Sequence, residues 1–209
     1  MELEQLIVER VSIRKWEDKP IEKEKIEKVL EAARRAPSWG NVQPWRFVVV
    51  QDRAKIEKMG EMSGDQDAVS KAGAVIVCCG VAGDFNKNLQ RAALKSVMDV
   101  DGFDWTVDFL DDVVMENDMF APYRKGKEIM EVKAGENVMI AISFMTVEAV
   151  QQGLGSCWVG ATDCKGVGEY LNLPKDWFVH DLLPIGYPAE SPKPRPRKVI
   201  EDIAFWETV

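Results

Sequence analysis

The sequence predicts an α+β protein in which helices pack around a small sheet. Helical patterns outnumber strand patterns, and the strands do not alternate regularly with helices along the chain. Hydrophobic residues make up 46% of the 209 residues, which is enough to bury one core and argues against global disorder. We therefore expect a single domain over residues 1–209.

The first two elements are predicted to be amphipathic helices. The first has apolar residues at helical spacing and ends near Val11. The second follows Pro20 and stops before Pro37, because the residue before a proline disfavours the helical backbone. The apolar positions are Leu3, Leu6 and Ile7 in the first helix, and Ile26, Val29, Leu30 and Ala33 in the second.

The middle of the chain predicts two buried strands and one helix. Residues 46–51 and 74–81 are runs rich in β-branched residues, which favour strands, and residues 55–62 read as a helix between them. Residues 83–135 are rich in Asp, Met and Phe and show weak periodicity. We expect one or two helices there and a mobile cap.

The last third predicts a helix that is apolar on nearly every side, over residues 137–152. Such a helix must be covered by its own core or by a partner chain. Gly153 is its predicted C-terminal stop. Short strands at 156–160 and 181–188 flank a small helix at 165–171, and the prolines near residue 195 predict an extended tail.

The composition excludes several classes of function. The net charge of −8 repels phosphate backbones and argues against nucleic acid as a partner. The most apolar stretch, residues 138–150, is shorter than a membrane span, and no apolar signal segment opens the chain. Four cysteines without a C-x-x-C motif indicate buried thiols in a reducing compartment, so we expect a cytoplasmic protein.

A single histidine, His180, restricts the chemistry further. One histidine excludes multi-histidine metal sites, so no metal is expected. Because it lies beside Asp181, it is a candidate general acid, but we interpret it as a surface or packing residue. If the protein is an enzyme, we expect a bound cofactor rather than a histidine side chain to carry out the chemistry.

Arg10, Ser12 and Arg14 form the first candidate cluster. In an extended chain, residues two apart point the same way, so two guanidinium groups and a hydroxyl would face one small anion. Arginine forks and a hydroxyl are partners that a phosphate needs. Taken alone, the triplet fits a solvated basic patch after a helix better than an anion site.

The loop P-S-W-G-N-V-Q-P-W, residues 37–45, is the second cluster. It supplies hydrogen-bonding side chains and a glycine that permits close backbone approach. Two tryptophans add aromatic surface, which suits a planar heteroaromatic ligand with a polar edge. The alternative is an ordinary turn whose tryptophans lie in the core, and Trp45 fits that alternative.

Two further clusters lie near the end of the chain. The first is G-L-G-S-C-W-V-G, residues 153–160. It does not match the dinucleotide fingerprint G-x-G-x-x-G, because Trp158 replaces the third glycine. We interpret it instead as a turn at the end of a helix that binds a ligand through backbone groups. In K-P-R-P-R-K, residues 193–198, alternating prolines hold two arginines in an extended frame from which both could reach one phosphate. The alternative for this run is a solubilising tail.

In this order, the four clusters resemble the FMN-dependent nitroreductase family. The matching motifs are R-x-S-x-R, P-S-x-x-N-x-Q-P-W, G-L-G-S-C-W-V-G and P-I-G-Y-P followed by R-P-R-K. The resemblance covers most of the chain except residues 83–135. It implies a nitroreductase-like fold with a small, mainly antiparallel sheet, built as an intertwined homodimer with FMN at the subunit interface.

The resemblance also implies roles for individual residues. Arginines and the first serine would hold the phosphate, the 37–43 loop would approach the flavin from the facing subunit, and the 153–160 segment would border the cofactor. The implied FMN-binding residues are Arg10, Ser12, Arg14, Pro37, Ser38, Asn41, Gln43, Gly155, Ser156, Trp158, Gly160, Arg195 and Arg197. Trp39 is assigned to the substrate, residues 83–135 to a lid, and no catalytic side chain is named.

The implied function is electron transfer from NADH or NADPH to a small acceptor, such as a nitroaromatic or a quinone, with ping-pong kinetics. Two alternatives stay open at this point. One is a non-catalytic protein that stores or delivers FMN, and the other is a protein of the same fold that binds a different phosphate ligand. The sequence leaves the acceptor and the choice of nicotinamide donor open.

Overall fold

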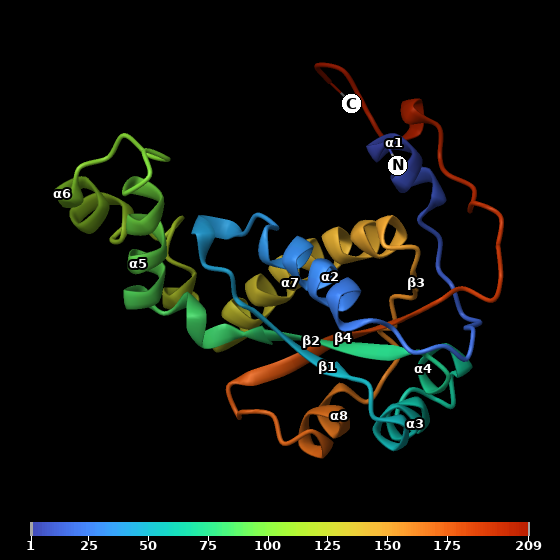
Figure 1. The fold of residues 1–209 in the computed structure, drawn as a ribbon. Helices are drawn as coiled ribbons and strands as arrows, with labels where there is room; N and C mark the ends of the chain where they lie inside the picture. Colours follow the sequence, from blue (N-terminus) through green and yellow to red (C-terminus); the bar gives the residue numbers. More distant parts are fainter. Residues whose placement is uncertain (1, 209) are drawn as a thin grey trace.

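The computed structural model describes residues 2–208. Four strands form one antiparallel sheet in the order β1-β2-β4-β3. Helices cover both faces of this sheet, as Figure 1 shows, so the α+β expectation is confirmed. The strands are β1 (Trp45–Val50), β2 (Ala74–Val81), β3 (Gly155–Ser156) and β4 (Trp177–Gly186).

Two helices pack on one face of the sheet and three on the other. The first face carries α2 (Lys23–Arg34) and α7 (Lys127–Gln151). The opposite face carries α3 (Arg53–Glu61), α4 (Asp67–Ser70) and α8 (Cys164–Tyr170). Each interface is a separate cluster of buried apolar side chains. The core therefore lies on both sides of the two central strands.

Strand β2 lies where the sequence predicts a buried strand. It pairs with β1 on one side and β4 on the other, and all eight of its residues are buried. A strand that is covered on both faces has no need for alternating polar residues, which explains its continuous apolar run. The strand predicted at 46–51 is β1, shifted by one residue.

The predictions for β3 and β4 need correction. β4 begins at Trp177 rather than at residue 181, because β2 runs far enough to pair Val81 with Trp177. β3 spans two residues rather than five. After Ser156 the chain stops pairing with β4, and Val159 then forms an isolated bridge to Leu182 of β4.

The largest boundary error concerns α7, which begins ten residues before the predicted start at residue 137. Its first turns carry exposed ion pairs, such as Lys133 with Glu136, which mask the apolar periodicity. Gly135 also weakens the helical pattern. The structure explains this glycine, because a Cβ there would lie 2.7 Å from Cδ2 of His180. Gly153 ends α7 with a φ of +71°, as predicted.

Residues 82–126 form a lobe beside the sheet, seen at the left of Figure 1. Its long helix is α5 (Lys87–Met98), so the expected one or two helices are present. Leu94, Leu110, Val114 and Met115 give it a small core of its own. Short turns complete it: η2 (Ala82–Phe85), α6 (Val107–Phe109), η3 (Leu110–Val114) and η4 (Pro122–Lys125).

The two ends of the chain meet beside β3. After the first helix, α1 (Leu3–Glu9), the chain is extended, and the Ile13 amide donates to the Ser156 carbonyl at 2.9 Å. The Glu190 carboxylate accepts from the backbone amides of Arg14 and Lys15. The tail beyond it is extended and largely exposed up to η5 (Ile200–Asp202), as the prolines predict.

Within residues 2–208 no helix is long and apolar enough to cross a membrane.

Candidate functional site

A hollow of about 370 Å³ lies between α1, the C-terminal half of α7 and β3. We call it the Arg10 hollow. It brings together four of the residues implied by the resemblance, although they come from distant parts of the chain. The lining residues are Ile7, Arg10, Ser12, Ser143, Thr146, Val147, Ser156 and Trp158.

Backbone pairing places the polar residues of this hollow. Arg10 leaves the helical conformation, and Ser12 forms a parallel bridge with Ser156. Gly155 makes the close approach possible, because a Cβ there would lie 2.6 Å from Cγ1 of Ile13. The result is a guanidinium and two hydroxyl groups on one side of the pairing, a donor set that suits a phosphate.

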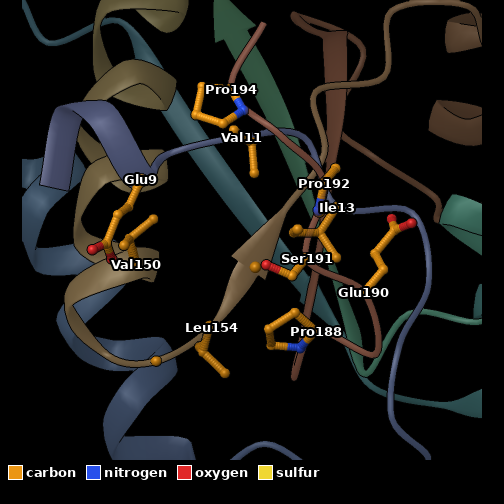
Figure 2. Close-up of a pocket in the computed structure, with 12 residues that line it drawn as sticks. Glu9, Val11, Ile13, Val150, Leu154, Pro188, Glu190, Ser191, Pro192 and Pro194 are labelled. Atoms are coloured by element: carbon orange, nitrogen blue, oxygen red, sulfur yellow. The ribbon is translucent and has the colours of Figure 1, made fainter.

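A second cavity, of about 530 Å³, lies beside the first, and we call it the tail crevice. Val11, Ile13 and Gly155 line it, whereas the residues that alternate with them line the Arg10 hollow. Figure 2 shows the carboxylates of Glu9 and Glu190 on opposite sides of the crevice. Two carboxylates disfavour an anion, so the smaller hollow is the better phosphate site.

The other predicted arginines do not line the Arg10 hollow in this chain. The Arg197 guanidinium donates to two carbonyls of its own tail, those of Arg195 at 3.1 Å and Pro196 at 2.9 Å. Arg14 is exposed, with its backbone amide held by Glu190. Their assignment to the phosphate stays a prediction.

The loop of residues 37–43 also lies apart from the hollow. Gly40, Asn41 and Gln43 all have φ between +52° and +56°, and the Ser38 hydroxyl accepts from the Gln43 amide at 3.0 Å. This tight turn packs against the lobe, where the Trp39 ring lies 5.9 Å from that of Phe85. Within one chain, no residue of this loop lines the Arg10 hollow.

Sequence reasoning missed the α7 side of the hollow. Ser143 and Thr146 are polar residues three apart in an otherwise apolar helix, and that spacing was the available signal. Their hydroxyls donate to carbonyls of the same helix, those of Met139 at 2.9 Å and Ser143 at 2.8 Å. Each hydroxyl oxygen still has a lone pair for a ligand.

His180 lies outside the hollow and packs against α7. Its Nδ1 atom is 2.5 Å from the buried carboxylate of Asp181, and Gly135 covers the ring. Within residues 2–208 no group of three or more His, Cys, Asp or Glu residues is arranged to hold a metal ion.

The cysteines are free thiols, and burial keeps them protonated. Burial raises the pKa of Cys79 to about 12 and that of Cys78 well above its usual value. We expect neither to react with a disulfide reagent at pH 8 in the native protein, because the thiolate fraction of Cys79 is then only on the order of 10⁻⁴. In denaturant all four thiols should react, which provides the control. Rapid labelling of three or more thiols in the native state would have to include Cys78 or Cys79 and would contradict this expectation.

Comparisons with known proteins identify the family and the fold. A profile of the nitroreductase family matches residues 7–187. A Bacillus subtilis protein named FMN reductase (NAD(P)H) is 30% identical over 199 residues, which are 94% of this chain and 70% of that protein. A Thermus thermophilus NADH dehydrogenase is 28% identical over 199 residues, 95% of this chain and 93% of that protein. A solved protein of Exiguobacterium sibiricum in complex with FMN has the same fold, with a TM-score of 0.79, 22% identity and coverage of 99% of this chain and 98% of that one.

Proposed function

The chain belongs to the nitroreductase family, an oxidoreductase family, and on that premise we propose that it is an FMN-dependent enzyme. It transfers electrons from NADH or NADPH to a small acceptor such as a nitroaromatic or a quinone. The observation that carries this proposal is the Arg10 hollow, which gathers Arg10, Ser12 and Ser156 within the matched residues. The name of the Bacillus subtilis relative supports both the cofactor and the donor.

The residues of the hollow fit the phosphate end of FMN. Arg10 supplies charge and two donors in a fork, and the hydroxyls of Ser12 and Ser156 add further donors. Ser156 is 3% exposed, so its position is fixed before a ligand arrives. Bound FMN would supply the electron-transfer chemistry, while these side chains hold and orient it.

The proposed working form is a homodimer. One face of α7 exposes a row of large apolar side chains, although the opposite face is fully buried. An exposed apolar row of this length is typical of a surface that pairs with another chain. The exposed residues are Ile129, Val132, Met139, Ile140 and Phe144.

Pairing through α7 also explains why the 37–43 loop and the Arg10 hollow lie apart within one chain. The 37–43 loop contacts α7 at Asn137, and the Arg10 hollow contacts it at residues 143–147. These positions are six to ten residues apart, or about 9–15 Å along a helix. A two-fold axis across α7 brings the loop of one subunit toward the hollow of the other.

The lobe of residues 82–126 is proposed as the lid over the acceptor. It is shorter than the sequence-based range of 83–135, because α7 accounts for the last nine residues of that range. The lobe contacts Trp39 through Phe85, which supports a role for Trp39 at the acceptor.

The proposed location is the cytoplasm, where the nicotinamide donors are available.

The test is spectroscopic and kinetic. Protein loaded with FMN and freed of excess should keep its flavin bands, and NADH or NADPH should bleach them. Turnover with a quinone or nitroaromatic should give parallel double-reciprocal lines, as ping-pong kinetics requires, at rates above those of free FMN. Bound flavin that neither donor bleaches would favour the storage protein, and a protein that does not bind FMN would overturn the proposal.

A further inference from the structure

Asn137 is a buried amide in the middle of α7 that forms a hydrogen bond outside its own helix. Its side chain is 3% exposed. Oδ1 accepts a hydrogen bond from the backbone amide of Trp39 at 2.8 Å, and Nδ2 donates to the Lys133 carbonyl at 2.6 Å. By contrast Thr146, the other buried polar residue of α7, bonds only to its own helix in the described structure.

The loop that Asn137 contacts is conformationally strained. Asn41 and Gln43 have positive φ values, which cost non-glycine residues about 1 kcal/mol or more each. The remaining bonds from residues 37–43 stay mostly within the loop, as between the Gln43 amide and Ser38. Asn41 reaches Ser96 of the lobe only at 3.5 Å. A strained turn keeps its shape only if its surroundings hold it, and the bond to Asn137 ties its backbone to α7.

We propose that Asn137 is a positioning residue that sets the 37–43 loop for the reaction. This inference rests on the proposed function, in which the loop completes the site of the facing subunit. The Trp39 backbone amide donates a hydrogen bond to Asn137, and the Trp39 ring packs against Phe85. Trp39 therefore contacts both α7 and the lid. Loss of the hydrogen bond from the Trp39 amide to Asn137 lets the turn relax toward negative φ. Trp39, Asn41 and Gln43 then move together.

The first arm of the test does not depend on activity. Hydrogen exchange of the peptide covering residues 37–45 is followed by mass spectrometry in the FMN-free protein. Asn137→Leu removes the acceptor, so exchange in this peptide should accelerate about tenfold, the effect of one lost hydrogen bond. Asn137→Asp keeps an acceptor oxygen and should leave this exchange near that of the parent, even though a buried carboxylate lowers Tm.

The second arm uses FMN-loaded protein with a quinone acceptor. Asn137→Leu should raise the acceptor KM about tenfold while kcat stays within about twofold, and Asn137→Asp should restore KM. Ile142→Val is the matched control, because it trims a buried apolar side chain of the same helix, five residues after Asn137. It should lower Tm and leave both loop exchange and KM unchanged.

Each outcome is decisive. Unchanged exchange in Asn137→Leu would show that the bond does not hold the loop. Faster exchange with an unchanged KM would show that the loop is held but does not serve the acceptor. If the parent protein lacks FMN activity, the proposed function fails, while the exchange arm still reports on the loop. If Asn137→Leu does not fold, Asn137→Ala replaces it in both arms.

Discussion

Arg10→Ala is expected to weaken FMN binding by about 1–3 kcal/mol, which corresponds to a loss of roughly 5- to 150-fold in affinity. Arg10 is the cationic side chain that lines the hollow, and a charge-assisted fork contact to the phosphate cannot be replaced by the two neighbouring hydroxyls. Flavin fluorescence during titration of the FMN-free protein measures the dissociation constant. The affinity should also fall with salt in the parent more steeply than in the variant, because the lost contact is ionic.

Two further arginines sharpen this experiment. Arg34→Ala is the matched control, since Arg34 is an exposed guanidinium of α2 that pairs with Glu31, and it should leave FMN binding unchanged. Arg197→Ala tests the tail, whose arginine bonds to its own backbone within one chain. A loss of similar size there would mean that the tail joins the phosphate site in the assembled protein. If Arg10→Ala and Arg197→Ala both retain FMN like the parent, the proposed phosphate site is wrong.

The sequence predicts those elements of the fold whose pattern arises from a single environment. β2 is covered on both faces and reads as an unbroken apolar run, while α2 has one buried side and shows a clear stripe. α7 is different, because its first turns are solvated and its middle has one buried face and one exposed apolar face. Two environments in one helix blur its periodicity, which is why the predicted start was ten residues late.

The site shows a similar division. Arg10, Ser12 and Ser156 meet because an extended segment pairs with β3 across most of the chain length, and local patterns carry no information on such a pairing. The order of the motifs supplied that connection through the family resemblance. The α7 wall was missed because Ser143 and Thr146 look like interruptions of an apolar helix until the fold shows what they face. In the proposed homodimer, the 37–43 loop comes from the facing chain.

Ile140→Glu is expected to convert the protein to a monomer. Ile140 is 38% exposed in the apolar row of α7, one turn before the residues that line the Arg10 hollow. Only the exposed part of Ile140 is left to bury, which contributes about a third of the 1.5–3 kcal/mol of a whole aliphatic side chain, so the main effect is the desolvation cost of a carboxylate placed in an apolar interface. A two-fold axis applies both effects twice, so the dimer dissociation constant should rise by at least about 100-fold. Sedimentation velocity at micromolar protein measures it.

The consequence for the cofactor makes this variant a test of the whole assembly. If the loop of the facing subunit completes the site, then a folded Ile140→Glu monomer should lose FMN although Arg10, Ser12 and Ser156 are unchanged. Val100→Glu is the control, because Val100 is 76% exposed in the lobe and lies outside the apolar row. It should stay dimeric and keep FMN. A monomer that binds FMN as tightly as the parent would mean that one chain holds the complete site, and the 37–43 loop would then need another role.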